Sequence, residues 1–328
     1  MDDKFTQSIE KPDPFSWTQK FTLTDEEVAM IADPKWVYPN LIIQGHVAVY
    51  PAPPNGGKTT IFAWIAGQIA NEYEVFYVNA DIAGGDSKEM QAQANQNGFK
   101  LLLPDMKAGL SMTDVVDNLE AMNALDHNYS SHVFIFDTLK KMTSVIQKER
   151  AKNLYKTLRG LSAKGMTIIL LAHTNKYNDA DGVPIYEGTG DLRSDVDEMI
   201  YLIPKKNDDG SMTVSTKPDK VRGSFKPLTF NISSDRRVSL ADEFVDVIDA
   251  MRYEHLVEED EPIIQAIHEA IDNQKVNQTE IVSYCKSIGI AGTRKTTKVL
   301  ERYSLPPIKL WNKQKAFENN AIQYFKVD

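Results

Sequence analysis

A lysine and a threonine that follow two glycines form the clearest chemical pattern in the chain, in the segment PAPPNGGKTT at Pro51–Thr60. The backbone N–H groups of such a loop can converge on phosphate oxygens, while the lysine neutralises the β- and γ-phosphates and the hydroxyl ligates Mg²⁺. We therefore expect ATP and Mg²⁺ to bind here. The expected nucleotide-binding residues of the loop are Ala52, Pro53, Pro54, Asn55, Gly56, Gly57, Lys58, Thr59 and Thr60.

Ala52 occupies the position of the first glycine of such loops. Glycine is obligatory only where the backbone is left-handed, so alanine is compatible with the loop if its φ is negative. The loop also needs a preceding strand, and a following helix whose positive amino end starts at the lysine. The apolar runs HVAVY and IFAWIAGQIA supply these two elements.

Acidic residues after two other apolar runs complete the predicted site. Asp137 ends HVFIFD, where a carboxylate can hold the water shell of the metal, so we expect Thr59 and, through water, Asp137 at the Mg²⁺. A hydrolase also needs a carboxylate that orients the attacking water. Asp81, at the end of EVFYVNAD, is our candidate for this role, and Glu89 is the alternative.

Short apolar runs alternate with helical patterns from Leu41 onward, which predicts an α/β protein whose mostly parallel sheet is covered by helices on both faces. The expected strands are HVAVY, EVFYVNAD, HVFIFD, TIILLAH, EMIYLI, SMTVST and PLTFNI. We divide the chain into an N-terminal arm or oligomerisation segment at 1–40, a core at 41–240, a linker at 241–257 and a C-terminal domain at 258–328.

The C-terminal residues 258–328 predict three short helices and a strand-like end, the element order of a winged helix-turn-helix, with a helical cap on the core as the alternative. The candidate recognition helix and the expected wing carry the basic and aromatic residues Arg294, Lys295, Lys298, Arg302, Trp311, Lys313 and Lys315. We expect Arg294, Lys295 and Lys298 to contact nucleic acid. This surface suits a duplex or forked junction, and equally a replication or recombination protein.

The order of these motifs resembles that of RecA-type hexameric ATPases, and most of all the RepA-type plasmid replicative helicases and their DnaB relatives. The resemblance rests on the glycine loop, the strand ending at Asp137, and the segments TIILLAHTNK, GTGDLRSDVDEMIYLI and KPDKVRG, over roughly residues 40–235. It implies a RecA-like ATPase core and a homo-oligomeric, hexameric ring.

The resemblance also implies roles for individual residues. His173 matches the polar residue that senses the γ-phosphate, and Lys220 and Arg222 match a pair that reaches toward the γ-phosphate of the neighbouring subunit. With Asp81, these residues form the expected catalytic set. The family usually has glutamate where this chain has Asp81, and the shorter side chain implies slower turnover.

In the ring ATPases, loops that follow the strands ending at Asp137 and His173 face the central pore. The resemblance therefore implies that single-stranded DNA contacts the basic residues Lys140, Lys141, Lys148, Arg150 and Lys176. A charge run of this kind is equally compatible with a solvated helix face.

The composition limits the other possibilities. A formal net charge of −9 argues against a protein that coats nucleic acid by bulk attraction. The single cysteine, Cys285, excludes an internal disulfide framework and a multi-cysteine zinc site. No apolar run approaches the roughly 20 residues that cross a bilayer, and the start MDDKFTQSIE lacks signal-peptide features, so we expect a cytoplasmic protein without a membrane partner.

The sequence leaves three functions open. The first is an ATP-dependent, ring-forming DNA helicase or translocase in the replication or recombination of a mobile element or phage. The second is a RecA-like ATPase that acts as a nucleotide-switched loader, recombination mediator or regulatory ring without processive unwinding. The third is a DNA-binding regulator in which the winged helix dominates.

Overall fold

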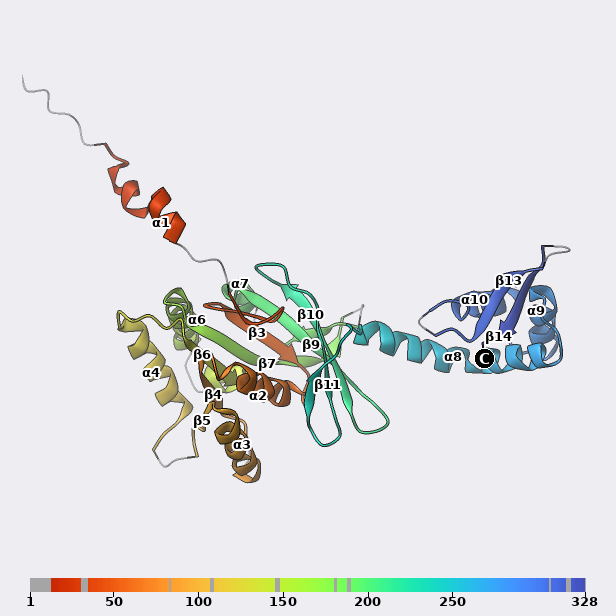
Figure 1. Ribbon diagram of the computed structural model, residues 1–328, viewed down its shortest axis with the longest axis horizontal. Helices are drawn as coiled ribbons and strands as arrows, with labels where there is room; N and C mark the ends of the chain where they lie inside the picture. Colours follow the sequence, from red (N-terminus) through yellow and green to blue (C-terminus); the bar gives the residue numbers. More distant parts are fainter. Residues whose placement is uncertain are drawn as a thin grey trace, which may run out of the picture.

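A computed structural model describes residues 13–30, 35–82, 84–106, 109–144, 148–179, 182–187, 190–306, 308–316 and 320–327. Its centre is a ten-stranded sheet in the order β12-β11-β10-β9-β3-β7-β6-β4-β5, with β8 paired to β7 (Figure 1). The strands are β3 (Val47–Ala52), β4 (Glu74–Asn79), β5 (Lys100–Leu102), β6 (His132–Asp137), β7 (Thr167–Asn178), β8 (Pro184–Tyr186), β9 (Glu198–Lys206), β10 (Met212–Lys220), β11 (Thr229–Ile232) and β12 (Val238–Leu240).

The middle of the sheet is parallel. β3 pairs in parallel with β7 and β9, and β6 pairs in parallel with β7 and β4, whereas β10, β11 and β12 continue the sheet in antiparallel fashion. The registers place Asn79 opposite Asp137, and Ala52 opposite His173. The carboxyl ends of β3, β4 and β6 therefore lie along one edge of the sheet, beside His173, although β7 continues to Asn178 and does not end at His173 as expected.

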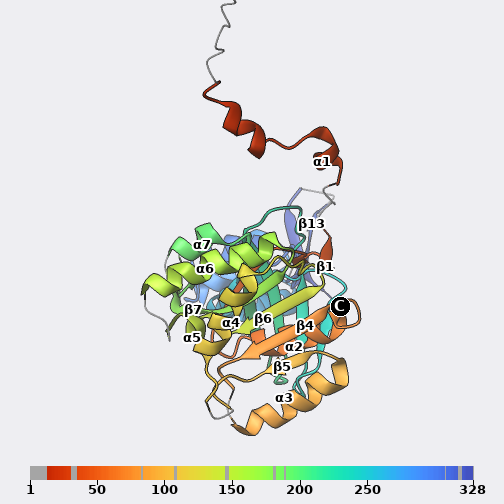
Figure 2. The same ribbon diagram turned by 90° about the vertical axis from the view of Figure 1, so that its left-hand side faces the viewer.

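Helices cover both faces of this sheet because its parallel strands are apolar on both sides. Along β3, Ala48 and Tyr50 point into one core with α2 and α3, while Val47 and Val49 point into a second core with α4, α5 and α6 (Figure 2). These helices and the short α7 have the bounds α2 (Lys58–Ile69), α3 (Gly84–Asn97), α4 (Met112–Ala124), α5 (Leu139–Ser144), α6 (Lys148–Ala163) and α7 (Gly190–Asp195).

The connection order defines the fold class. β4 follows β3 in the chain, yet β7 and β6 lie between them in the sheet, and the glycine loop connects β3 to α2. This is the RecA-like α/β fold expected from the sequence, with a mostly parallel sheet between two helical layers. A small sheet of β1 (Trp36–Tyr38) and β2 (Ile42–Ile43) adds Val37 and Ile42 to the core around α2.

The N-terminal segment holds a 3₁₀ helix, η1 (Ser16–Phe21), and a short helix, α1 (Asp25–Met30), which extend away from the sheet (Figure 1). None of the residues of η1 is buried. The first twelve residues of the predicted arm at 1–40, and residues 31–34, lie outside the described residues.

The C-terminal unit consists of α8 (Val247–Asp272), α9 (Gln278–Ser287), α10 (Thr293–Arg302), β13 (Trp311–Lys315) and β14 (Ile322–Lys326). It has its own apolar core, with Tyr303, Trp311 and Tyr324 as its largest members. Three helices and a hairpin therefore occur in the expected order. Among the described residues, no helix has the length and apolar character needed to span a membrane.

The predicted linker at 241–257 is helical from Val247 onward, because α8 runs without a break into the C-terminal unit (Figure 1). Asp246 caps this helix, its carboxylate accepting hydrogen bonds from the backbone N–H groups of Ile248 and Asp249. Glutamate is a good helix former, which is why the acidic stretch at 254–261 continues a helix here. Val247 and Ile248 are buried in the core that contains α6.

Candidate nucleotide-binding site

The loop between β3 and α2 needs both of its glycines. Gly57 has a φ of 82°, and a Cβ added to it would lie 2.6 Å from Cδ1 of Ile232. A Cβ on Gly56 would lie 2.8 Å from the carbonyl oxygen of Pro53. Ala52, in contrast, is the last residue of β3 and is absent from the positive-φ residues, so alanine costs nothing at this position.

The amino end of α2 is suited to an anion. No side chain of the described residues caps this helix, whose N-cap is Gly57. The first backbone N–H groups of a helix have no partner within it, and together with the helix dipole they favour a phosphate. The loop itself is accessible, because Pro54 and Asn55 at its tip and Thr59 in the first helical turn are exposed, while Thr60 is half-buried.

Lys58 lies inside the loop and is only 5% exposed. Its Nζ donates to the carbonyl oxygens of Ala52 and Pro53, at 3.0 and 3.1 Å, and lies 3.4 Å from Nδ1 of His173. Burial lowers the pKa of Lys58 to about 8, although the charges of Asp137 and Asp81 oppose the shift. Burial and the neighbouring Lys58 also lower the pKa of His173, so a neutral imidazole faces the ammonium group.

Thr59 and Asp137 form the second part of the site. The Thr59 hydroxyl donates to Oδ2 of Asp137 at 2.6 Å, and the Tyr77 hydroxyl donates to the same oxygen at 2.9 Å. Burial raises the pKa of Asp137, and these two hydrogen bonds oppose that shift. A hydroxyl and a carboxylate side by side are hard oxygen ligands, so this pair fits the coordination that Mg²⁺ prefers.

Asp81 is closer to this site than Glu89. The charge of Asp81 acts on Lys58, Asp137 and His173, and its carboxylate lies 3.6 Å from Nζ of Lys141. Glu89, in contrast, is exposed on α3. The backbone N–H of Asp81 donates to Oδ1 of Asn79 at 3.0 Å, which fixes the chain just after β4.

Lys220 and Arg222 lie at the other edge of the sheet. Arg222 Nη1 is 3.1 Å from Oδ1 of Asp197, and Asp197 also accepts a hydrogen bond from the backbone N–H of Val47, the first residue of β3. The two ends of β3 are about 16 Å apart at the usual rise per residue. These two basic residues therefore lie away from the glycine loop of their own chain.

The two members of this pair differ in their contacts. Nζ of Lys220 donates to the carbonyl oxygens of Arg193, Ser194 and Val196, at 2.8, 3.0 and 2.6 Å. An ammonium group has three N–H donors, so these contacts use all of them. Arg222, with five donors, has a side chain that is 56% exposed.

The predicted pore residues are engaged differently. Lys140 lies 3.0 Å from Glu187, and Lys141 forms the ion pair with Asp81. Lys148 and Arg150 belong to α6 and Lys176 belongs to β7, but their side chains lie outside the described residues.

On α10, the side chains of Arg294, Lys295 and Lys298 are exposed, and no acid of the described residues pairs with them. Arg302, in contrast, forms an ion pair with the buried Asp260. Arg302 thus lies on the expected helix, with its guanidinium paired within the C-terminal unit.

Trp311 lies in the C-terminal hairpin, where the wing was expected, with its side chain turned into the core of the unit. It is fully buried, and its Nε1 donates to the carbonyl oxygen of Leu300 at 2.7 Å. Lys313 and Lys315 on the same strand are exposed.

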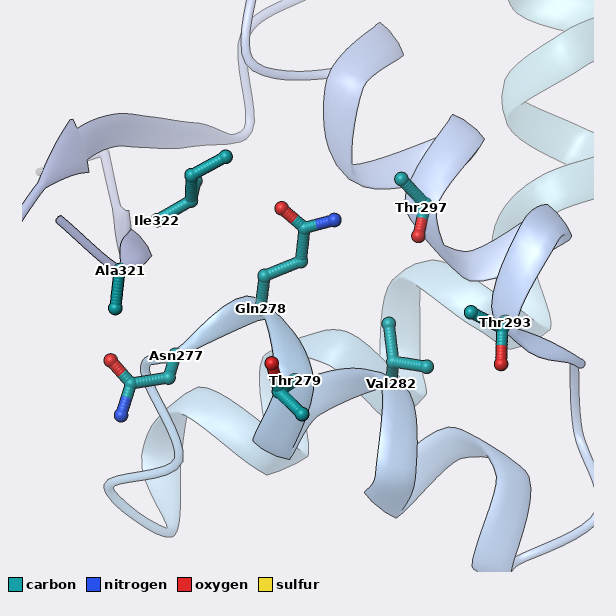
Figure 3. A pocket seen from close by; sticks show the side chains of 8 residues that line it. All are labelled: Asn277, Gln278, Thr279, Val282, Thr293, Thr297, Ala321 and Ile322. Carbon is teal, nitrogen blue, oxygen red and sulfur yellow. The ribbon is translucent and has the colours of Figure 1, made fainter.

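A groove between α9, α10 and the start of β14 is lined by Gln278, Thr279, Thr293 and Thr297, among others (Figure 3).

Tyr77 and Asn79 are site residues that the sequence did not single out. Along β4 they alternate with Phe76 and Val78, which face the core that contains α4, α5 and α6. Asn79 lies at the carboxyl end of β4, opposite Asp137. Polar side chains in the last positions of an apolar strand were the available signal.

No protein-family model matches the chain, and no curated protein matches it. Among solved structures, it is similar to the flagellar accessory protein FlaH from Methanocaldococcus jannaschii, with a TM-score of 0.43 and 16% identity over 61% of this chain and 92% of that chain. The fold class is therefore defined by the sheet topology and the glycine loop.

The pKa of Lys58 gives the site an expected pH dependence. Phosphate oxygens favour the charged form of the lysine, so nucleotide binding raises its pKa above about 8 and takes up a proton at higher pH. The affinity for ATP should fall by up to about tenfold per pH unit above pH 8, because Lys58 must then take up a proton from the solution when ATP binds. Titrations with a fluorescent ATP analogue from pH 7.5 to 9.5 measure this fall. Lys58→Met should bind more weakly with a flat profile, and a flat wild-type profile would contradict the assignment.

Proposed function

We propose that this chain is an ATP-dependent, ring-forming helicase or translocase that moves along single-stranded DNA. The observation that carries the proposal is the division of the site between two edges of one sheet. The glycine loop, Lys58 and Asp137 lie at one edge, and the exposed Arg222 lies at the other. A head-to-tail contact between identical copies would bring these edges together, and contacts of this kind form a ring when the rotation between copies closes.

The residues of the loop edge have distinct roles in this proposal. Lys58 and the loop backbone hold the phosphates, His173 lies beside Lys58 to respond to the γ-phosphate, and Asp81 orients the attacking water. Thr59 and Asp137 would hold Mg²⁺, which supplies charge neutralisation at the phosphates when bound. Arg222 of an adjacent copy stabilises the charge that develops on the transferred phosphoryl group.

Nucleic acid would contact the basic residues that follow β6 and lie in β7. In this arrangement the ring is hexameric, as in the RepA-type helicases, and Lys140, Lys141, Lys148, Arg150 and Lys176 track the phosphates of the strand. The natural setting is the replication or recombination of a plasmid, phage or other mobile element in the cytoplasm.

The C-terminal unit extends this function. We propose that it is a winged helix whose exposed α10 residues Arg294, Lys295 and Lys298 bind a DNA duplex ahead of the ring, or a replication partner. Its separate apolar core, which includes the second half of α8 while the start of α8 packs on the sheet domain, suits a module that works outside the ring (Figure 1).

The test of the proposal is ATP turnover with and without single-stranded DNA, combined with separation of a tailed duplex. We expect DNA to increase turnover several-fold and the tailed duplex to separate only when ATP and Mg²⁺ are present. An ATPase that ignores DNA and leaves the duplex intact would contradict a helicase.

Two other functions have an observation in their favour. The pairing of Asp81 with Lys141 favours a slow ATPase that uses nucleotide as an assembly switch, as a loader, mediator or regulatory ring would. Oligomers that form with ATP, without DNA-stimulated turnover, would identify it. The exposed basic residues of α10 favour a DNA-binding regulator. Binding of a DNA duplex that is unchanged in Lys58→Ala would identify this function.

A further inference from the structure

Asp197 is a buried acid at the edge of the sheet that carries Arg222. It directly precedes β9, and its side chain is only 4% exposed. Oδ2 accepts hydrogen bonds from the backbone N–H of Val47 at 3.0 Å and from Nη1 of Arg159 at 2.5 Å. Oδ1 lies 3.1 Å from Nη1 of Arg222. One carboxylate thus joins Arg222 to the first residue of β3, the strand whose other end leads into the glycine loop.

The carboxylate is held charged. Burial alone would raise the pKa of Asp197, but the hydrogen bonds from Val47 and Arg159 outweigh that effect and keep the pKa below its ordinary value. Asp197 is therefore ionised at neutral pH, and its charge attracts the guanidinium of Arg222.

The surroundings of Asp197 are fixed on both sides. Lys220 binds the carbonyl oxygens of the turn that leads into Asp197, including that of Val196. On the other side, Glu198 is fully buried, and its Oε1 lies 2.7 Å from Nδ1 of His46. The acid that holds the side chain of Arg222 is thus itself held in place by its neighbours.

Arg222 still has donors for a partner. Its exposed guanidinium carries five N–H groups, and the contact with Asp197 involves one of its terminal nitrogens. Holding a long side chain from one end reduces the conformational entropy that it loses when it binds a second group.

We propose that Asp197 is a positioning residue for Arg222, whose guanidinium it holds ready for the nucleotide bound to a neighbouring copy. This inference rests on the proposed ring function. A carboxylate would repel a phosphate, so Asp197 acts through the arginine and does not touch the nucleotide itself.

The first test is Asp197→Asn, which keeps the shape and leaves an amide oxygen that can accept from Val47. We expect kcat for ATP hydrolysis to fall by about tenfold or more, with a change of less than about twofold in the affinity for ATP. Asp219→Asn is the matched control, because Asp219 pairs with Arg193 near the same edge but not with Arg222. It should keep its kcat within about twofold of wild type, and thermal unfolding checks that both variants fold.

Mixed oligomers then show whether Asp197 acts through Arg222 or through the glycine loop of its own subunit. Lys58→Ala lacks a working loop but keeps Arg222, whereas Arg222→Ala lacks the arginine but keeps the loop, so mixing the two should restore ATP hydrolysis. Asp197→Asn should be rescued by Lys58→Ala subunits and not by Arg222→Ala subunits. Rescue by Arg222→Ala subunits instead, or an unchanged kcat in Asp197→Asn, would overturn the inference. If Lys58→Ala and Arg222→Ala fail to restore each other, the ring function itself fails, which is a distinguishable result.

Discussion

Lys58→Ala should lower ATP hydrolysis by about a thousandfold and weaken ATP binding by at least about tenfold. The ammonium group lies between the loop carbonyls and His173. Among the described residues, no other side-chain cation donates to the carbonyl oxygens of Ala52 and Pro53. Without it, the phosphates lose the charge that compensates them during transfer. Steady-state hydrolysis and titration with a fluorescent ATP analogue measure the two effects separately.

The same substitution should leave the fold intact. Folding lowers the pKa of Lys58 to about 8. Between pH 8 and the pKa of this lysine in the unfolded chain, the unfolded chain therefore binds more protons than the folded protein. Below pH 8 the charged lysine lowers the free energy of unfolding by its full cost. Removing it at pH 7 should therefore leave the thermal unfolding temperature equal or higher. A variant that folds and hydrolyses ATP like wild type would show that the loop is not the site.

Arg222→Ala should lower turnover by about a thousandfold or more while changing ATP binding by less than about threefold, because an arginine supplied by a neighbour acts on the transition state. The structure supports this separation, since Arg222 contacts Asp197 at the amino end of β3 and the loop lies at the other end. Turnover and ATP affinity are measured on the same preparation of assembled protein.

Arg193→Ala is the control for this prediction, because Arg193 is an exposed arginine nearby that pairs with Asp219. It should lose no more than about twofold in turnover. The mass of both variants in the presence of Mg-ATP should equal that of wild type. Loss of ATP binding in parallel with turnover, or a monomer under all conditions, would contradict a role for Arg222 across a subunit boundary.

The fold class and the loop could be predicted because their signals are local. Apolar runs of strand length alternate with helical patterns, and PAPPNGGKTT with the strand before it and the helix after it is continuous in the sequence. Asp137 was also predictable, since an acid at the end of an apolar strand falls at the carboxyl edge of a parallel sheet. The structure places Asp137 beside Thr59 at that edge.

The remaining features depend on contacts between distant segments. Asp197 and Arg222 are 25 positions apart by residue number, and nothing local shows that one carboxylate would meet both Arg222 and Val47. The saturation of Lys220 by carbonyl oxygens was equally hidden, because backbone acceptors leave no pattern in a sequence. Arg302 shows the same limit, since its partner Asp260 lies on α8, with α9 between them in the chain.

The central claim is that ATP hydrolysis at the Lys58 loop drives movement along single-stranded DNA. The most direct measurement is the rate of ATP hydrolysis by the assembled wild-type protein, with and without single-stranded DNA, alongside separation of a tailed duplex in the same preparation. We predict that DNA raises the rate several-fold and that the duplex separates with wild type but not with Lys58→Ala. A rate that DNA does not change, with the duplex left intact, would contradict the claim.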